Sequence, residues 1–469
     1  MWEMVIGLET HVELSAKTKL FCSCSTRFGS DPNTHCCHIC TGQPGSLPVM
    51  NKAVVQLAAT AGIVLNCTIN KHSQMARKHY FYPDLPKAYQ ITQYDKPLCE
   101  HGSMELSGGR GIRITRIHIE EDAGKLVHMG GAVLIDNNRG GVPLIEIVTA
   151  PDFRSAEEVV EYLETLQNSL RAAGVSDCRM QEGSLRCDVN ISLRRQGSDA
   201  LGIRTEVKNM NSFTAVAEAI EYEYNRHKRL LDSGGPLVQE TRGWDAEYGE
   251  TVSLREKDDA EDYRYMPEPD IFDIFISDDE IAQLRDAIPE LPDKKFKRYV
   301  NELGILPADA KLLTKYARVS EYFEEASEGL KEPKTVASLM VTRMFSRITT
   351  EVQRENWSPK TTARQIGELA QMCESGKLSH NLAKRVFTQM IEKGHDAGDF
   401  ITADDLEQFS AQALSALCRE IVEQNEKTVS DYRAGKEKAI KALVGAVMKS
   451  SKGRADAKTA ENLLKEMLK

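Results

Sequence analysis

Three ionisable residues, Glu9, His11 and Glu13, stand at alternate positions near the N-terminus. The alternation of these residues with apolar ones predicts a half-buried β-strand over residues 5–14, with the ionisable groups on one face. Two carboxylates beside an imidazole can bind a divalent metal or perform acid–base chemistry. A solvated strand face gives the same pattern, so this strand alone leaves both interpretations open. The apolar residues of the pattern are Ile6, Leu8, Val12 and Leu14.

Cysteine spacing predicts a metal site downstream of this strand. Cys22 and Cys24, together with Cys37 and Cys40, could supply four thiolates to one tetrahedral Zn²⁺. Four protein ligands leave no open coordination position, so such a zinc would be structural. Reduced loop cysteines without a metal are the alternative. The odd total of eleven cysteines suits reduced thiols or metal ligation better than a disulfide framework.

Residues 77–90 interleave basic and aromatic side chains, an arrangement that can contact phosphates and stack on bases. Pro83 and Pro86 lack backbone donors, which predicts a loop or a sheet edge here. An aromatic-rich loop that packs on the core is the structural alternative. The residues of interest are Lys78, Tyr80, Tyr82 and Lys87.

Further carboxylates lie in apolar surroundings. Residues 117–122 end a predicted strand in the run Glu120-Glu121-Asp122, and Glu146 interrupts the apolar run 142–148. An ionised carboxylate in such a strand is costly unless a cation meets it. A functional site and a structural partner such as Arg139 both account for Glu146.

Residues 184–194 and 202–209 predict an antiparallel pair with charges of both signs on one face. This face could bind phosphates and their metal, or it could be an ordinary solvated sheet face. The chain has no P-loop, no strand-led dinucleotide fingerprint and no kinase signature set. A bound nucleotide would therefore need carboxylate-held Mg²⁺ and scattered basic groups. The candidate phosphate-binding residues are Arg186, Arg204, Glu206 and Lys208.

Length and periodicity predict several domains. No apolar run approaches the ~20 residues of a membrane span, and the N-terminus lacks signal-peptide features, so we expect a cytoplasmic protein. Strand patterns fade near residue 293 and helical spacing takes over. We predict an α+β fold with an antiparallel-sheet domain over residues 1–293 that carries the candidate catalytic residues, an all-α domain over 294–402 and a small helical tail over 403–469.

The tail is basic although the whole chain has a net charge of −10. From Asp431 onward, ten Lys and Arg face five Asp and Glu. This excess predicts a surface that binds a nucleic-acid backbone, with a solubilising helical tail as the alternative. The charge concentrates at Lys449, Lys452 and Arg454.

These motifs, in this order, resemble the B subunits of the bacterial aspartyl/glutamyl-tRNA amidotransferases. The resemblance is carried by residues 6–14, the cysteine pairs and residues 80–87, 120–125, 142–148 and 262–265. It spans essentially the whole chain and is most specific in residues 1–270. The sequence departs from the common pattern at Thr10, Ala88 and Met266, and none of these departures removes a charged role.

The resemblance implies an ATP-dependent carbon–nitrogen ligase that works in a heterotrimer with an amidase (glutaminase) A subunit and a small C subunit. Such an enzyme phosphorylates the side-chain carboxylate of Glu-tRNA(Gln), Asp-tRNA(Asn) or both. Ammonia from the A subunit then travels through a tunnel and displaces the phosphate. Two other hypotheses remain, namely a non-catalytic zinc-stabilised tRNA-binding protein and a free-standing ligase that takes ammonia directly.

The resemblance also implies roles for particular residues. It assigns Mg²⁺ binding and catalysis to Glu9, His11, Glu121 and Glu146. Strand alternation by itself places Glu120, not Glu121, on the face of His118, so the assignment of Glu121 rests on the resemblance. The tunnel exit and the tRNA acceptor end are assigned to Lys78, Tyr80, Tyr82 and Lys87.

Overall fold

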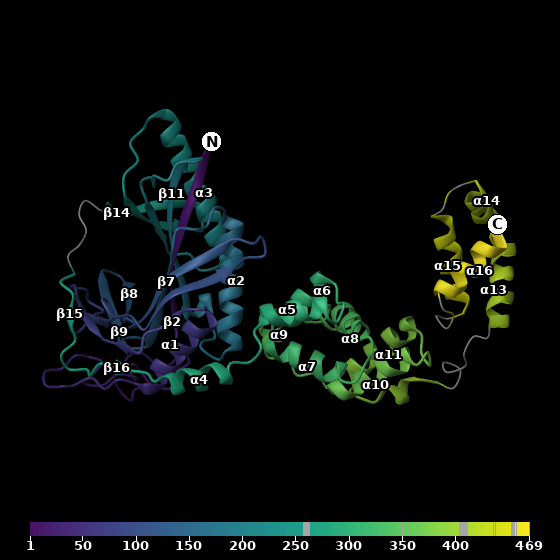
Figure 1. Cartoon of the computed structure of the whole chain (residues 1–469), viewed down its shortest axis with the longest axis horizontal. Coiled ribbons are helices and arrows are strands. Elements are labelled where there is room, and N and C mark those ends of the chain that lie inside the picture. The colour runs from purple at the N-terminus through teal and green to yellow at the C-terminus, as the bar shows by residue number, and fades with distance from the viewer. Residues whose placement is uncertain are drawn as a thin grey trace. The chain divides into compact units, whose positions relative to one another are not determined.

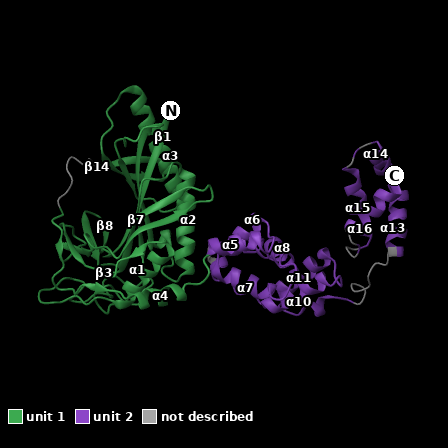
Figure 2. Ribbon diagram, viewed as in Figure 1, with its two compact units in different colours: residues 1–291 green, residues 292–469 purple. Residues whose placement is uncertain are grey.

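The computed structural model describes residues 1–256, 263–348, 350–402, 411–434, 436, 438–451, 455 and 457–468. The chain forms two compact units, residues 1–291 and residues 292–469 (Figure 2). In the described ranges, no helix combines the length and the apolar character needed to cross a membrane.

A nine-stranded sheet organises the first unit, with β1 at its centre (Figure 1). Every neighbouring pair is antiparallel except β12 and β13, which run parallel. The predicted α+β class and antiparallel sheet are confirmed. In spatial order the strands are β14 (Glu250–Glu256), β13 (Glu240–Asp245), β12 (Thr205–Lys208), β11 (Leu185–Arg195), β1 (Trp2–Glu13), β10 (Pro143–Thr149), β7 (Gly111–Glu121), β6 (Cys99–Glu105) and β2 (Thr68–Ile69).

Helices cover one face of this sheet and leave the other to polar side chains. The alternate apolar residues of β1 join one buried cluster with residues of α1 (Lys52–Val64), α2 (Ala156–Ala172) and α3 (Phe213–Ser233). Ser155 and Ser212 cap α2 and α3 by accepting backbone N–H groups of the first turn. Because strand side chains alternate, the polar residues of β1 lie on the face opposite these helices.

Short strands complete the first unit. β4 (Ala76–His79) pairs with β5 (Tyr89–Thr92) and with β15 (Met266–Pro267). Two further antiparallel pairs join β3 (His72–Ser73) to β16 (Ile274–Phe275), and β8 (Lys125–Met129) to β9 (Ala132–Asp136). A one-turn 3₁₀ helix, η1 (Met180–Glu182), precedes β11, and α4 (Asp278–Ala287) lies near the end of the unit.

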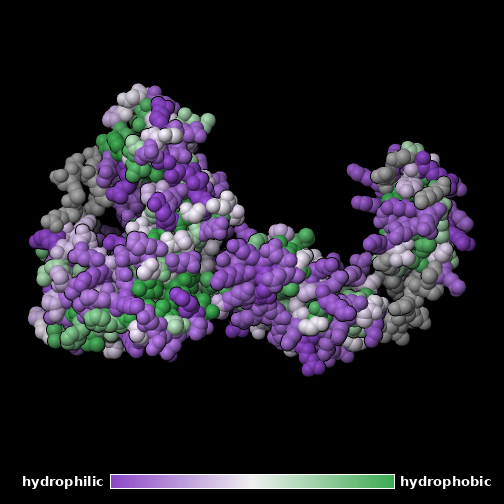
Figure 3. All heavy atoms as spheres, in the orientation of Figure 1, coloured by the Kyte–Doolittle hydropathy of each residue, from purple (hydrophilic) through white to green (hydrophobic). Residues whose placement is uncertain are grey.

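The second unit is helical and has two separate hydrophobic clusters. The visible surface of its helices is mostly hydrophilic (Figure 3). Ser379 caps α11 and Gly394 ends it with a left-handed backbone. The first cluster holds α5 (Pro292–Asn301), α6 (Pro307–Thr314), α7 (Ala317–Ser327), α8 (Lys334–Leu339), η2 (Met340–Met344), α10 (Ala363–Glu374), α11 (His380–Lys393) and η3 (Ala397–Phe400), with α9 (Glu351–Glu355) on the same segment. The second holds α13 (Ala411–Gln424), α14 (Glu426–Arg433), α15 (Ala439–Ser450) and α16 (Ala457–Leu468).

Candidate functional site

Three central strands bring two histidines and two carboxylates together on the polar face of the sheet. The register places His118 of β7 opposite Glu146 of β10, and Glu146 opposite His11 of β1. Glu120 shares the face because it lies two residues beyond His118 on β7. His11 Nε2 is 3.3 Å from a Glu120 oxygen and 3.6 Å from a Glu146 oxygen, and His118 Nε2 is 3.2 Å from Glu146. We call these four residues the histidine–carboxylate group.

The charges in this group stabilise one another. Burial would lower the pKa of His11, but its hydrogen bond with Glu146 and the charges of Glu120 and Glu146 raise it to about 9. His118 and His11 hold the pKa of Glu146 well below its usual range despite burial. One ligand atom each from His11, Glu120 and Glu146 lies within 4.8 Å of the others. A divalent cation bound by these three atoms would displace the proton of His11.

A second acidic group adjoins the first. Glu9, Asp188 and Glu206, from β1, β11 and β12, each offer a carboxylate oxygen within 4.8 Å of the others. The pKa of Glu9 is raised by burial and then by the charges of Glu146, Glu206 and Asp188, so the two groups influence each other. We call these three residues the carboxylate group. Since three carboxylates meet here, the group is rich in the oxygen ligands that hard cations prefer.

Neutral and cationic side chains orient the carboxylate group. Asn190 Nδ2 donates a 3.0 Å hydrogen bond to Glu9, and Lys208 Nζ donates to Glu206 at 3.0 Å and also to Asp188. Burial would lower the pKa of Lys208, but the charges of Asp188 and Glu206 raise it above its usual value. The single ammonium of Lys208 can offset only one of the three carboxylate charges.

The structure places Glu121 on the other side of β7, which differs from the expectation drawn from the resemblance. Glu121 accepts hydrogen bonds from Lys87 Nζ at 2.6 Å and from the backbone N–H of Ile91 at 2.8 Å. Neighbouring strand residues point to opposite faces, so only Glu120 can reach His11. Arg139 also differs from its suggested role, because it lies 3.6 Å from Asp122 and not beside Glu146.

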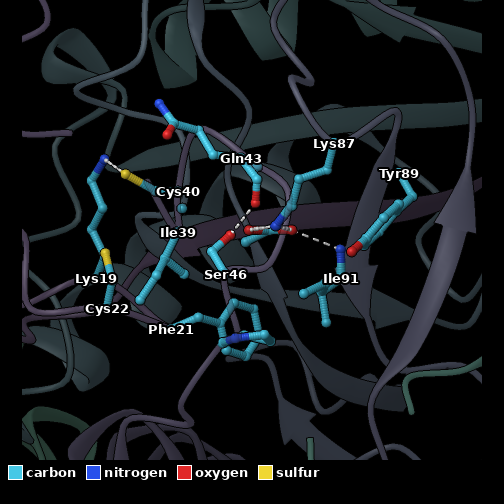
Figure 4. Close-up of a pocket in the computed structure, with 14 residues that line it drawn as sticks. Lys19, Phe21, Cys22, Ile39, Cys40, Gln43, Ser46, Lys87, Tyr89 and Ile91 are labelled. Atoms are coloured by element: carbon cyan, nitrogen blue, oxygen red, sulfur yellow. Dashed lines mark hydrogen bonds and ion pairs between the residues drawn. The ribbon is translucent and has the colours of Figure 1, made fainter. Parts of the chain in front are cut away.

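A cavity of about 120 Å³ lies between the cysteine loop and the Lys87–Glu121 pair, and residues of both line it (Figure 4). Lys19 and Cys40 line one side, and Lys87, Tyr89 and Ile91 line the other. The cavity therefore links the loop of residues 19–48 to the side of β7 that faces away from the histidine–carboxylate group.

The four predicted cysteines converge on one point of that loop. The sulfur atoms of Cys22, Cys24, Cys37 and Cys40 lie within 4.8 Å of one another. Hydrogen bonds from the Cys22 thiol and the Cys37 amide, with the charge of Lys19, lower the pKa of Cys40 to about 4. The group fits a tetrahedral thiolate site in which at least one sulfur is readily ionised.

The chain matches known families over most of its length. Residues 4–282 match the GatB/GatE catalytic domain family, and residues 321–468 match the GatB domain family. The chain is 45% identical over 476 residues to the B subunit of the aspartyl/glutamyl-tRNA(Asn/Gln) amidotransferase of Carboxydothermus hydrogenoformans, covering 100% of this chain and 99% of that one. With the B subunit of the same name from Caldicellulosiruptor saccharolyticus it shares 47% identity over 475 residues, with the same coverage. The chain belongs to the family of aspartyl/glutamyl-tRNA(Asn/Gln) amidotransferase B subunits.

The other residues proposed for substrate binding in this amidotransferase B subunit lie in different settings. Arg186 stands opposite His11 and donates to Asp122 at 2.7 Å, whereas Arg204 is exposed.

Lys78 Nζ lies 4.5 Å from the centre of the Tyr263 ring and 5.4 Å from that of Tyr80. Tyr82 is 60% exposed, and Lys449 is exposed in the last turn of α15. The expectations for Lys452, Arg454 and Asp262 lie outside the described residues.

Sequence reasoning gave no role to three residues of the polar face. His118 belongs to the histidine–carboxylate group and Asp188 to the carboxylate group, and Arg116 lies two residues before His118 on β7. Strand alternation indicates the face of each, but the strand register that joins them is a long-range feature. The residues of this polar face therefore meet through pairing between strands, which no single sequence motif reveals.

Proposed function

We propose that this chain uses ATP to phosphorylate the side-chain carboxylate of Glu-tRNA(Gln), of Asp-tRNA(Asn) or of both. The observation that carries the proposal is the adjacency of the histidine–carboxylate group and the carboxylate group on one rigid sheet face. Transfer of a γ-phosphate to a carboxylate brings two anions together, and catalysis must neutralise both. The two groups are suited to hold the cations that do so.

Mg²⁺ fits the donors that the chain offers. His11, Glu120 and Glu146 would hold one ion, and Glu9, Asp188 and Glu206 would hold another. When bound, these ions supply charge neutralisation for the phosphates and for the substrate carboxylate. His118 orients Glu146 through its 3.2 Å contact, and Asn190 and Lys208 orient the carboxylate group.

Amidation would proceed in two steps, phosphoryl transfer followed by displacement of the phosphate. A carboxylate oxygen of the aminoacyl group attacks the γ-phosphorus, the bond from that phosphorus to the β–γ bridging oxygen breaks, and ADP leaves. Ammonia then attacks the acyl carbon, loses a proton and expels inorganic phosphate. The products are Gln-tRNA(Gln) and Asn-tRNA(Asn).

The ammonia source and the assembly are part of the proposal. The relatives are named as subunits, and we propose an amidase (glutaminase) A subunit that releases ammonia and a small C subunit in a heterotrimer. The tunnel exit would lie at Lys78, Tyr80, Tyr82 and Lys87.

All eleven cysteines are unpaired, which suits a reducing cytoplasm. Glutamine-dependent amidation of both misacylated tRNAs, with and without the A subunit, tests this assignment. Amidation of neither would contradict it.

Zinc at the four cysteines leads to a first prediction. Metal analysis of tag-free protein is expected to find about one Zn²⁺ per chain, and Cys40→Ser should lower that content and the melting temperature. Ammonium-dependent turnover of the remaining folded protein should continue, because the cysteines lie away from the polar face.

Lys19 offers a second variant for this site. It is fully buried, and its Nζ lies 3.5 Å from Cys40 Sγ, so Lys19→Met should weaken zinc retention without removing a ligand. A folded parent protein that contains no zinc would contradict the zinc assignment.

The basic C-terminal segment leads to a second prediction. Removal of residues 403–469, which contain the second helical cluster, should raise the KM for tRNA and flatten its salt dependence, because phosphate contacts release counterions. ADP formation at saturating tRNA should survive. Equal tRNA affinity of the truncated and full-length chains at every salt concentration would contradict a tRNA-binding role.

A further inference from the structure

Arg116 is a cation on the polar face with no ion-pair partner in the part of the chain that the structure describes. The register aligns Arg116 of β7 with Val148 of β10, and Val148 with Glu9 of β1. Glu100, its neighbour on β6, accepts a 2.7 Å hydrogen bond from Asn70 Nδ2 instead. Among the described residues, the guanidinium of Arg116 has neither a hydrogen bond nor an ion pair.

A stacked pair of tyrosines lies beside this guanidinium. The rings of Tyr94 and Tyr265 are nearly parallel, at an interplanar angle of 8°, with centroids 4.0 Å apart. Burial raises the pKa of Tyr265 to about 12, and the charges of Arg116, Glu146 and Glu120 also act on this pKa. Tyr94 remains 45% exposed despite the stacking.

The backbone fixes this pair against β7. Gln93 Oε1 accepts hydrogen bonds from the backbone N–H groups of Ile119 at 2.9 Å and Leu98 at 3.2 Å. Gln93 is 1% exposed, so a buried side chain next to Tyr94 ties this segment to β7, the strand that carries Arg116. Tyr265 comes from a segment far along the chain, next to β15, and stacks onto it.

A guanidinium beside stacked aromatic rings matches a nucleotide. Arginine binds phosphate through paired N–H donors, and aromatic rings stack on bases. We propose that Arg116, Tyr94 and Tyr265 form a subsite for an adenosine 5′-phosphate, and that its occupant is the terminal nucleotide of the aminoacyl-tRNA. This inference rests on the proposed function, because it concerns the second substrate of that reaction.

The position of the subsite favours the tRNA end over ATP. Lys208 and the carboxylate group lie on β1, β11 and β12, and they offer a cation and metal ligands for the phosphates of ATP. Arg116 lies on β7, the strand of His118 and Glu120, which β10 separates from β1 in the strand order. A terminal adenosine held there would direct its esterified amino acid toward His11, Glu120 and Glu146, between the two substrates.

Steady-state kinetics of the complete amidotransferase tests the inference. Arg116→Gln and Tyr265→Leu are each expected to raise the KM for misacylated tRNA by roughly five- to hundredfold, the range of base-stacking and phosphate contacts. The KM for ATP at saturating tRNA should stay unchanged. Arg116→Gln should also reduce the slope of log KM against log salt by about one, and Tyr265→Leu should not. Tyr265→Phe should restore the parent value, since it keeps the ring.

Matched controls separate this subsite from general loss of charge or of a ring. Arg229 is exposed on α3, and Tyr248 is 74% exposed in the turn between β13 and β14. Arg229→Gln and Tyr248→Leu should leave both KM values unchanged. A rise in the KM for ATP alone would assign the subsite to the nucleotide and overturn the inference, as would unchanged KM values in both test variants.

A binding measurement covers variants that fold poorly. With 2-aminopurine in place of the terminal adenine of uncharged tRNA, stacking should quench its fluorescence on binding to the parent and to Tyr265→Phe. Tyr265→Leu should abolish the quenching, and no quenching with the parent would overturn the inference. If these tests fail while His11→Ala still abolishes tRNA-dependent ADP formation, the proposed function stands and only the subsite is lost.

Discussion

Replacement of His11 by alanine is expected to slow tRNA-dependent ADP formation by on the order of a hundredfold or more. The imidazole lies 3.3 Å from Glu120 and 3.6 Å from Glu146, at the centre of the histidine–carboxylate group. Its loss would remove a proposed metal ligand and the imidazole that contacts both Glu120 and Glu146. Glutamine hydrolysis by the partner should continue, while its coupling to amidation is lost.

The variant needs a control for folding, because His11 also stabilises its neighbours. The pKa of His11 is raised to about 9, so near neutral pH its positive charge offsets the buried carboxylates. Thermal unfolding and circular dichroism should show that His11→Ala retains the fold before its rate is interpreted. A folded variant that forms ADP at the parent rate would make His11 an ordinary strand histidine.

The adjacent residues Glu120 and Glu121 provide a matched pair of variants with very different expected effects. Glu120→Gln removes the charge closest to His11 and should slow ADP formation by on the order of a hundredfold. Glu121→Gln removes the same charge one residue away, on the opposite face, and should slow it far less. It should instead destabilise the protein by about 1–3 kcal/mol, because Lys87 loses its buried partner.

Activity assays and urea unfolding of both variants check this pair. The order of the two effects decides the assignment, since each substitution conserves shape and removes one negative charge. A severe loss of ADP formation in Glu121→Gln, with near-parent activity in Glu120→Gln, would support the assignment implied by the resemblance. It would also contradict the geometry of β7.

The sequence allowed the prediction of features that depend on local periodicity. Alternation in residues 5–14 correctly indicated the buried and polar faces of β1, and the same rule placed Glu120 on the face of His118. Helix caps such as Ser379 and Gly394 of α11 are local interactions of the same kind. The change from strand to helical spacing near residue 293 supported the α+β fold class.

Features that depend on strand register could not be predicted in this way. Glu9, Asp188 and Glu206 are close because β11 pairs with β1 on one side and with β12 on the other. β1 is distant in sequence from both of these strands, so no local pattern sets this register. Tyr94 and Tyr265 stack across a comparably long separation in sequence.

The resemblance assigned a metal-binding role to Glu121, whereas the structure places Glu120 beside His11. The run Glu120-Glu121-Asp122 contains three adjacent acids, and only the strand geometry distinguishes which of them faces His11. Glu121 instead meets Lys87, a contact that no local pattern indicates.

The most direct test of the phosphoryl-transfer assignment is ADP formation in a single turnover of the complete enzyme, with excess ATP, no glutamine and limiting Glu-tRNA(Gln) or Asp-tRNA(Asn). The account predicts one ADP per misacylated tRNA in the parent, little ADP with uncharged tRNA, and a rate at least about a hundredfold lower in Glu146→Gln. Glu146→Gln keeps the shape of a side chain that contacts both His11 and His118. ADP formation at the parent rate in a folded Glu146→Gln protein, or at equal rates with charged and uncharged tRNA, would contradict the account.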